Sequence, residues 1–253
     1  MGKNKLARWN ELKSWANVIE PEISSVVENR APCDNDPDRF PSWNVTVKDH
    51  PVKGRWKSEI FKNSNPVVLE LGCGRGEYTT GLSIRFSGKN FVGVDIKGAR
   101  LWRGAKTSNE LNLQNTAFLR TRIEFINSFF GRDEADEIWI TFPDPHPGMR
   151  NANKRLTSPW YLNSYRKFVR DNGIIHLKTD NTELFEYTLK VIRNNKLELL
   201  ASTKDLYAEN YPDDILSIKT HYEQIFLSTG LKICYLSFRL PSDKYIRDET
   251  QRQ

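Results

Sequence analysis

Apolar and polar residues alternate along most of the chain in short blocks, and these blocks predict strands and helices in turn. The first clear block, residues 67–71 (Val-Val-Leu-Glu-Leu), is an apolar run of the length of a buried strand. Further strands are predicted at 90–95, 116–120, 137–142, 174–178, 197–202 and 233–239, and helices after the first strand and at 98–113, 158–171 and 181–194. This alternation is typical of an α/β fold with an open, mostly parallel, doubly wound sheet and helices on both faces.

The segments on either side of this region have a different composition. Apolar residues from Leu12 to Ile19 fall on one helical face, which predicts a helical extension over 1–30 with a break at Pro21. Residues 31–57 hold four prolines with several Asn and Asp, as irregular connectors do. The predicted division is 1–57 as N-terminal helical extension and connector, 58–240 as the α/β domain, and 241–253 as a charged tail.

Composition adds constraints on the partner and the compartment. The net charge of +6 and the pI of about 9.1 suit a polyanionic partner, although a charge of this size also lies within the range that solubility alone explains. No apolar run is long enough to cross a membrane, and we expect neither a membrane segment nor a secretory leader. The cysteines (Cys33, Cys73 and Cys234) and the four histidines show no metal-ligand spacing. We therefore expect reduced thiols, no metal site and a cytoplasmic location.

A glycine turn follows the first strand. Gly72, Gly74 and Gly76 form a G-x-G-x-G pattern where a strand passes into a helix, and glycines there let a ligand approach the backbone closely. Asp95 ends the second strand, where a carboxylate can accept both hydroxyls of a ribose. The alternatives are a purely structural turn and a surface Asp. Cys73, inside the turn, is interpreted as a small side chain in a tight place rather than as a nucleophile.

A proline-rich loop follows the fourth strand, and it holds one carboxylate. Pro143 and Pro145 bracket Asp144 and stiffen its backbone, as the positioning of a catalytic group requires. The competing interpretation is a surface turn in which Asp is a common residue. His146 is either an acid or base, or an exposed loop residue.

Basic and acidic residues then follow this loop. Arg150, Lys154 and Arg155 lie beside aromatic residues, a combination that suits RNA, although an amphipathic helix has the same pattern. Asp180 ends the fifth strand, where it either faces the ligand crevice or caps the next helix.

These stations, in this order, resemble the bacterial tRNA (guanine-N7-)-methyltransferase family. The matching segments are 69–76 (Leu-Glu-Leu-Gly-Cys-Gly-Arg-Gly), 91–95 (Phe-Val-Gly-Val-Asp), 142–145 (Phe-Pro-Asp-Pro), 153–155 (Asn-Lys-Arg), 179–180 (Thr-Asp) and 220–223 (Thr-His-Tyr-Glu). The glycine turn alone indicates only the broad class of methyltransferases that use S-adenosylmethionine (SAM). The later segments are specific, and the resemblance covers about 60–240.

The resemblance implies a Rossmann-like, SAM-dependent methyltransferase fold with an antiparallel C-terminal strand, and methylation of N7 of a guanine in tRNA. It implies that SAM is bound by Glu70, the three glycines, Asp95 and the residue at 122, and that Asp144 is the catalytic carboxylate beside it. The implied substrate contacts come from Asp180, Thr220 and Glu223, together with Arg150, Lys154 and Arg155.

The chain departs from the family pattern at three places. Arg122 stands where an acidic or amide residue usually lies near the adenine of SAM. His146 stands where a Trp usually follows Asp-Pro, and Gly148 lies near the place of an expected Lys, with one extra residue before Lys154.

Two other functions compete with tRNA methylation. One is SAM-dependent methylation of another RNA, a protein or a small molecule, and the other is a non-catalytic RNA-binding module with a relict cofactor fold. A nicotinamide dehydrogenase does not fit, because its glycine turn has the spacing G-x-G-x-x-G. The sequence leaves open whether the chain is a monomer or a homodimer.

Overall fold

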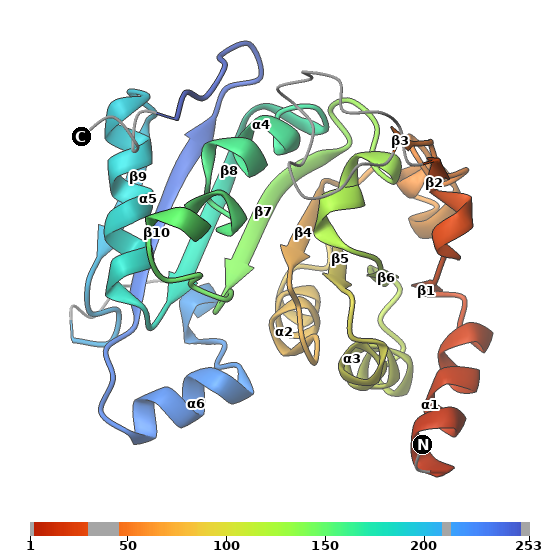
Figure 1. The fold of residues 1–253 in the computed structure, drawn as a ribbon. Helices are drawn as coiled ribbons and strands as arrows, with labels where there is room; N and C mark the ends of the chain where they lie inside the picture. Colours follow the sequence, from red (N-terminus) through yellow and green to blue (C-terminus); the bar gives the residue numbers. More distant parts are fainter. Residues whose placement is uncertain (1–2, 30–45, 209–213, 249–253) are drawn as a thin grey trace.

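An eight-stranded sheet forms the centre of the computed structural model, which describes residues 3–29, 46–208 and 214–248 (Figure 1). Its strands are β1 (Val18–Ile19), β4 (Val67–Leu71), β5 (Asn90–Asp95), β6 (Thr116–Arg120), β7 (Ala135–Thr141), β8 (Val169–Thr179), β9 (Leu199–Thr203) and β10 (Cys234–Leu240). They lie in the order β1-β6-β5-β4-β7-β8-β10-β9. Two further strands, β2 (Val27–Asn29) and β3 (Thr46–Val47), pair with each other.

Helices connect the strands of the sheet. The longer ones are α1 (Lys3–Ser14), α2 (Glu77–Arg85), α3 (Gly98–Glu110), α4 (Pro159–Tyr165), α5 (Thr182–Asn194) and α6 (His221–Ser228). The short ones are η1 (Ile23–Ser25), η2 (Trp56–Phe61), η3 (Ile123–Ser128), η4 (Met149–Lys154) and η5 (Asp214–Ser217). Figure 1 shows α2 and α3 next to each other, with α1 beyond α3.

The directions of the strands confirm the predicted fold class. From β1 to β8 every neighbouring pair is parallel, whereas β10 runs antiparallel to both β8 and β9. The carboxyl ends of β4 to β8 therefore meet at one edge of the sheet. The strand order reverses between β4 and β7, and open α/β sheets bind ligands beside such a reversal.

The core extends into the segment before the first predicted strand. Trp56 of η2 is fully buried and stacks on Phe130, with ring centroids 4.9 Å apart. Glu134 accepts hydrogen bonds from the backbone N–H groups of Gly54 and Trp56, at 2.7 and 2.9 Å. This part of the predicted connector 31–57 is thus packed onto the α/β domain, while residues 31–45 lie outside the described part of the chain.

Two element predictions were wrong. The N-terminal helix ends at Ser14, and Val18 and Ile19 form β1 beside β6, because β-branched residues fit an edge strand well. The helix predicted over 158–171 ends at Tyr165, and β8 begins at Val169. Val169 already pairs with Ala135 of β7, so sheet pairing decides this segment against its helical pattern, and β8 continues past Asn172, whose φ is 56°, to Thr179.

Candidate active site

A cavity of about 330 Å³ opens at the carboxyl ends of β5, β6 and β7. Five of the predicted site residues line it: Gly72, Asp95, Arg122, Asp144 and Lys154. The other predicted residues do not line it: Glu70, Gly74, Gly76, Arg150, Arg155, Asp180, Thr220 and Glu223. Residues from five separate segments of the chain therefore meet where this fold places its ligands.

The glycine turn presents bare backbone to the cavity. Gly72 has a φ of +78°, and a side chain built there would meet no atom within 4 Å, so the space in front of it is open. Gly76 has a different role at the start of α2, because a Cβ there would lie 2.7 Å from the ring of Phe118. The turn thus combines an exposed approach at its first glycine with tight packing at its last.

Asp95 is held in place by the same turn. Its Oδ2 accepts a hydrogen bond from the N–H of Gly74 at 2.9 Å, and its Oδ1 accepts one from the N–H of Lys97 at 2.7 Å. The side chain cannot turn away without losing both bonds. Each oxygen keeps a further lone pair, so the carboxylate can still accept hydrogen bonds from a vicinal diol.

Glu70 lies behind the turn and is 3% exposed. It accepts hydrogen bonds from the N–H and hydroxyl of Thr79 and from the hydroxyl of Thr141, the last at 2.7 Å. Burial raises the pKa of Glu70 to about 7, against the lowering effect of these bonds. Its carboxyl ties the start of α2 to the end of β7, and its contact with the cofactor stays a prediction.

Cys73 is buried in the same turn. Burial, with the nearby charges of Glu70 and Asp95, raises the pKa of its thiol well above the ordinary value. A thiol held protonated is a poor nucleophile, which agrees with its interpretation as a small residue in a tight place.

A carboxylate that the sequence prediction missed lies next to Arg122. Glu124, two residues further along η3, also lines the cavity and accepts a hydrogen bond from Arg122 Nη2 at 2.9 Å. Ile96 and Ile123 contribute apolar surface to the same end of the cavity. The end next to Asp95 therefore has a carboxylate acceptor even though position 122 is basic.

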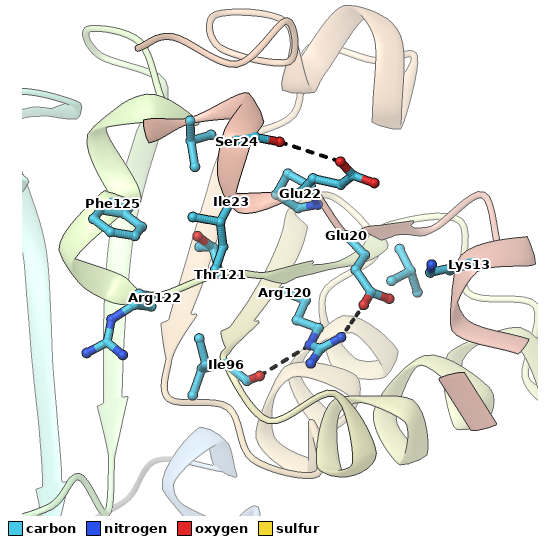
Figure 2. Close-up of a pocket in the computed structure, with 13 residues that line it drawn as sticks. Lys13, Glu20, Glu22, Ile23, Ser24, Ile96, Arg120, Thr121, Arg122 and Phe125 are labelled. Atoms are coloured by element: carbon cyan, nitrogen blue, oxygen red, sulfur yellow. Dashed lines mark hydrogen bonds and ion pairs between the residues drawn. The ribbon is translucent and has the colours of Figure 1, made fainter. Parts of the chain in front are cut away.

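A second, larger cavity of about 830 Å³ adjoins this end and shares Ile96, Thr121 and Arg122 with it. Figure 2 shows the N-terminal segment forming one wall, with Glu20 paired to Arg120. Arg120 also donates a hydrogen bond from Nε to the carbonyl of Ile96 at 3.3 Å. The N-terminal segment thus braces the turn after Asp95, a contact that no local sequence pattern predicts.

The loop that carries Asp144 has an unusual backbone. Phe142 and His146 both have positive φ values, 48° and 43°, which side chains other than glycine adopt at a cost of about 1 kcal/mol or more each. The N–H of Phe142 donates to the carbonyl of Lys178 at 2.8 Å, and Asp144 itself is exposed. Backbone strain of this kind is concentrated at functional sites.

Arg155 braces the loop from inside the protein. It is 1% exposed, and its Nε donates to the carbonyls of Pro145 and His146 at 3.1 and 3.2 Å. Its Nη2 pairs with Glu183 at 2.6 Å, and its guanidinium lies 4.5 Å from the ring centroid of Tyr187. Its N–H donors therefore bind protein acceptors, and the side chain is too deeply buried to make the predicted contact with RNA.

Lys154 and Arg150 differ from Arg155 in exposure. Both are exposed on η4, and Lys154 lines the cavity. Of the aromatic residues that follow them, Tyr165 is buried in the core, and Tyr161 is buried but lines the cavity. Of the three predicted basic substrate contacts, Arg150 and Lys154 are therefore exposed to a substrate, whereas Arg155 is not.

The remaining acidic stations lie around β8 and α6. Asp180 is half-buried, and burial raises the pKa of its carboxyl. Asn181, not Asp180, caps α5 by accepting a hydrogen bond from the N–H of Leu184. Thr220 caps α6 and forms a reciprocal capping box with Glu223.

Glu223 has no exposed surface. It pairs with the equally buried Lys178 at 2.7 Å, and it accepts a hydrogen bond from the hydroxyl of Tyr207 at 2.6 Å. Lys178 also donates to the carbonyls of Leu216 and Ile218. These contacts fasten α6 to β8, and direct binding of a guanine by Glu223 stays a prediction.

Comparison with known proteins identifies the family. Residues 64–236 match the family model described as "Putative methyltransferase". The tRNA (guanine-N(7)-)-methyltransferase of Bacteroides fragilis is 48% identical over 248 residues, which is 98% of this chain and 90% of that protein. The protein of the same name from Porphyromonas gingivalis is 51% identical over 191 residues, 75% of this chain and 78% of that one. This chain belongs to the tRNA (guanine-N(7)-)-methyltransferase family.

Solved structures agree at the level of the fold. A 16S rRNA methyltransferase, KamB, superposes with a TM-score of 0.58 at 14% identity and covers 78% of this chain and 96% of its own. An antibiotic-related methyltransferase superposes with a TM-score of 0.55 at 16% identity, covering 76% and 96%. The predicted family and methyltransferase fold are confirmed. In the described residues, no helix is both long and apolar enough to cross a membrane.

Proposed function

We propose that this enzyme transfers the methyl group of SAM to N7 of a guanine in tRNA. The observation that carries the proposal is the meeting of Gly72, Asp95 and Asp144 on one cavity at the carboxyl ends of the strands. The names of the relatives support tRNA as the substrate and guanine N7 as the target. The cytoplasmic location expected from the sequence is part of the same proposal.

The residues present fit SAM. A volume of about 330 Å³ lies within the usual range for a small-molecule site. Asp95, fixed by two backbone N–H groups, would hold the ribose hydroxyls, while Gly72 leaves room for the amino-acid part. Glu124 would accept a hydrogen bond from the exocyclic amine of the adenine, in place of an acid at position 122. When bound, SAM supplies a methyl group on a positively charged sulfonium.

The substrate side needs carboxylates rather than a base. Guanine N7 has an in-plane lone pair and no proton, so nothing has to be removed from it before it attacks. The purine becomes positively charged as the methyl group arrives. Asp144 and Asp180, accepting hydrogen bonds from the N1–H and the amine of guanine, would bind that cation more tightly than the neutral base. The braced Asp144 loop supplies the positioning.

The decisive experiment uses radiolabelled SAM and unmodified bulk tRNA, followed by digestion and identification of the labelled nucleoside. We expect 7-methylguanosine. Binding of SAM with no label in tRNA would instead favour another substrate, and absence of SAM binding would favour a non-catalytic RNA-binding module.

Asp144 is tested by the variant Asp144→Asn. We expect turnover to fall on the order of a hundredfold, because an electrostatic contact made in the transition state is lost. Binding of S-adenosylhomocysteine, measured by calorimetry, and of tRNA should stay within twofold of wild type. Asp243→Asn, which changes an exposed carboxylate in the C-terminal segment, is the matched control. Near-normal turnover of Asp144→Asn would remove Asp144 from the catalytic role.

A further inference from the structure

Four cations follow one another along α3 at intervals of three residues. Lys97, at the N-cap, is followed by Arg100, Arg103 and Lys106. Residues three apart are neighbours on a helix surface, so the four form an oblique row that rises about 14 Å along the axis and winds about half a turn around the helix. Lys97 and Arg103 are exposed, and Arg100 and Lys106 are half-buried. These four residues are called the α3 basic row.

The row begins at the candidate active site. Lys97 and Arg100 line the same cavity as Asp95 and Asp144. The guanidinium of Arg100 lies 5.5 Å from the ring centroid of Tyr222, an exposed residue of α6. From there the row runs along α3 away from the cavity.

The charges of the row are largely uncompensated. Among the described residues, Lys97, Arg100 and Arg103 form no ion pair, and Lys106 has only a long surface contact of 3.8 Å with Glu110. Like charges at this spacing destabilise a helix by a few tenths of a kcal/mol per pair. A row that opposes helix formation in the free protein is well suited to a polyanion, because each cation that meets a phosphate releases a counterion.

The N-terminal helix extends the row. Arg8 of α1 lies with its guanidinium 4.6 Å from the ring centroid of Trp102, and Lys106 lies 5.1 Å from the same ring. The indole N–H of Trp102 donates to Glu11 at 2.6 Å, so this acid is already engaged. Figure 1 shows α1 beside α3, which places Arg8 and the far end of the row on adjoining helices.

We propose, on the basis of the function given above, that the α3 basic row, continued by Arg8 of α1, carries the sugar-phosphate backbone of tRNA to the active site. Contacts of this kind position RNA without reading its sequence. The row therefore contributes to affinity for tRNA in general, while the cavity selects the guanine. The N-terminal helix is, in this role, part of the RNA-binding surface.

The test removes two charges at the far end of the row, away from the cavity, in the double variant Arg103→Gln/Lys106→Gln. The matched control is Lys190→Gln/Arg193→Gln on α5, which removes one Lys and one Arg at the same spacing elsewhere on the protein. Glutamine keeps the helix propensity in both. Dissociation constants for tRNA are measured over a series of KCl concentrations, and binding of S-adenosylhomocysteine confirms an intact fold.

For the row variant we expect about tenfold weaker binding of tRNA, as two surface ion contacts supply. A plot of the logarithm of the association constant against the logarithm of the salt concentration should become less steep, with the magnitude of its slope reduced by about two. The control should match wild type, and S-adenosylhomocysteine binding should be unchanged in both. Wild-type affinity and slope in the row variant overturn the proposal, as does equal weakening in both double variants.

The wild-type methylation assay separates this proposal from the proposed function. Formation of 7-methylguanosine with wild-type affinity in the row variant overturns the row alone. Absence of methylation, together with selective weakening in the row variant, overturns the methyl transfer and supports the row as an RNA-binding surface.

Discussion

Arg155 shows how one buried cation controls the geometry of the loop that holds Asp144. Arg155→Lys keeps the charge but cannot donate to the carbonyls of Pro145 and His146 while also pairing with Glu183. We expect the turnover number to fall by about tenfold or more, because small misplacements of a catalytic group are costly. The melting temperature should fall as well, since buried acceptors lose a charged donor.

The measurement that separates this positioning role from a phosphate contact is tRNA binding against salt. A positioning residue changes turnover and leaves the dissociation constant and the salt slope as they are. If Arg155→Lys instead weakens tRNA binding and leaves turnover at saturation intact, Arg155 acts on the substrate and not on the loop.

At the residue scale, the sequence identified the positions that end strands. Asp95 is the last residue of β5 and Asp144 lies in the loop after β7, and parallel strands bring their carboxyl ends to one edge of the sheet. Burial of Arg155 was not predicted, because a short Asn-Lys-Arg sequence does not indicate whether its basic side chains are exposed or buried. Glu124 was not predicted because the family resemblance places the adenine contact at position 122, whereas Arg122 and Glu124 both line the cavity.

At the scale of elements, β4 and β5 were predictable because they are mostly apolar and buried on both faces. The strand β1 was not, because two residues give no periodicity and its pairing with β6 joins segments about a hundred residues apart. Contacts at such separations are set by tertiary packing, which local patterns do not contain.

The attachment of α6 to the sheet depends on the buried pair of Lys178 and Glu223. Glu223→Gln should lower the free energy of unfolding by about 3 kcal/mol, because it leaves the ammonium of Lys178 buried without its counter-charge. The double variant Lys178→Met/Glu223→Gln should recover much of that loss, since the uncompensated charge is removed. Denaturant unfolding of the single and double variants measures both effects.

Methylation by the double variant then decides the second role of Glu223. If stability returns and methylation does not, the carboxylate also contacts the guanine, as the family resemblance implies. If both return, Glu223 serves only to hold α6 and the Thr220 cap. A double variant that is no more stable than Glu223→Gln would contradict the ion pair as the origin of the loss.

At the scale of the whole molecule, a largely buried cluster of polar side chains joins three strands of the sheet and the turn after α2. Glu137 of β7 lies 3.1 Å from His176 of β8 and 3.0 Å from Lys89. His176 stacks on Trp139 at 3.8 Å and hydrogen-bonds the hydroxyl of Tyr235, on β10, at 2.9 Å. None of these residues lines the active-site cavity, so we expect the cluster to contribute to stability and not to catalysis.

This cluster predicts how the enzyme responds to acid. Although burial opposes ionisation, the contacts of Glu137 with His176 and Lys89 lower its pKa from 4.5 to about 2. A carboxyl with a lowered pKa in the folded state stabilises the protein at all pH values above its unfolded pKa. That contribution, on the order of 3 kcal/mol, is lost as pH falls from about 4.5 to about 2.

Urea unfolding of wild type should therefore show the free energy of unfolding falling through this pH window. In Glu137→Gln the same window should be flatter and stability at neutral pH lower, while S-adenosylhomocysteine binding is unchanged. An equal acid response in the two proteins would assign the loss to other carboxylates.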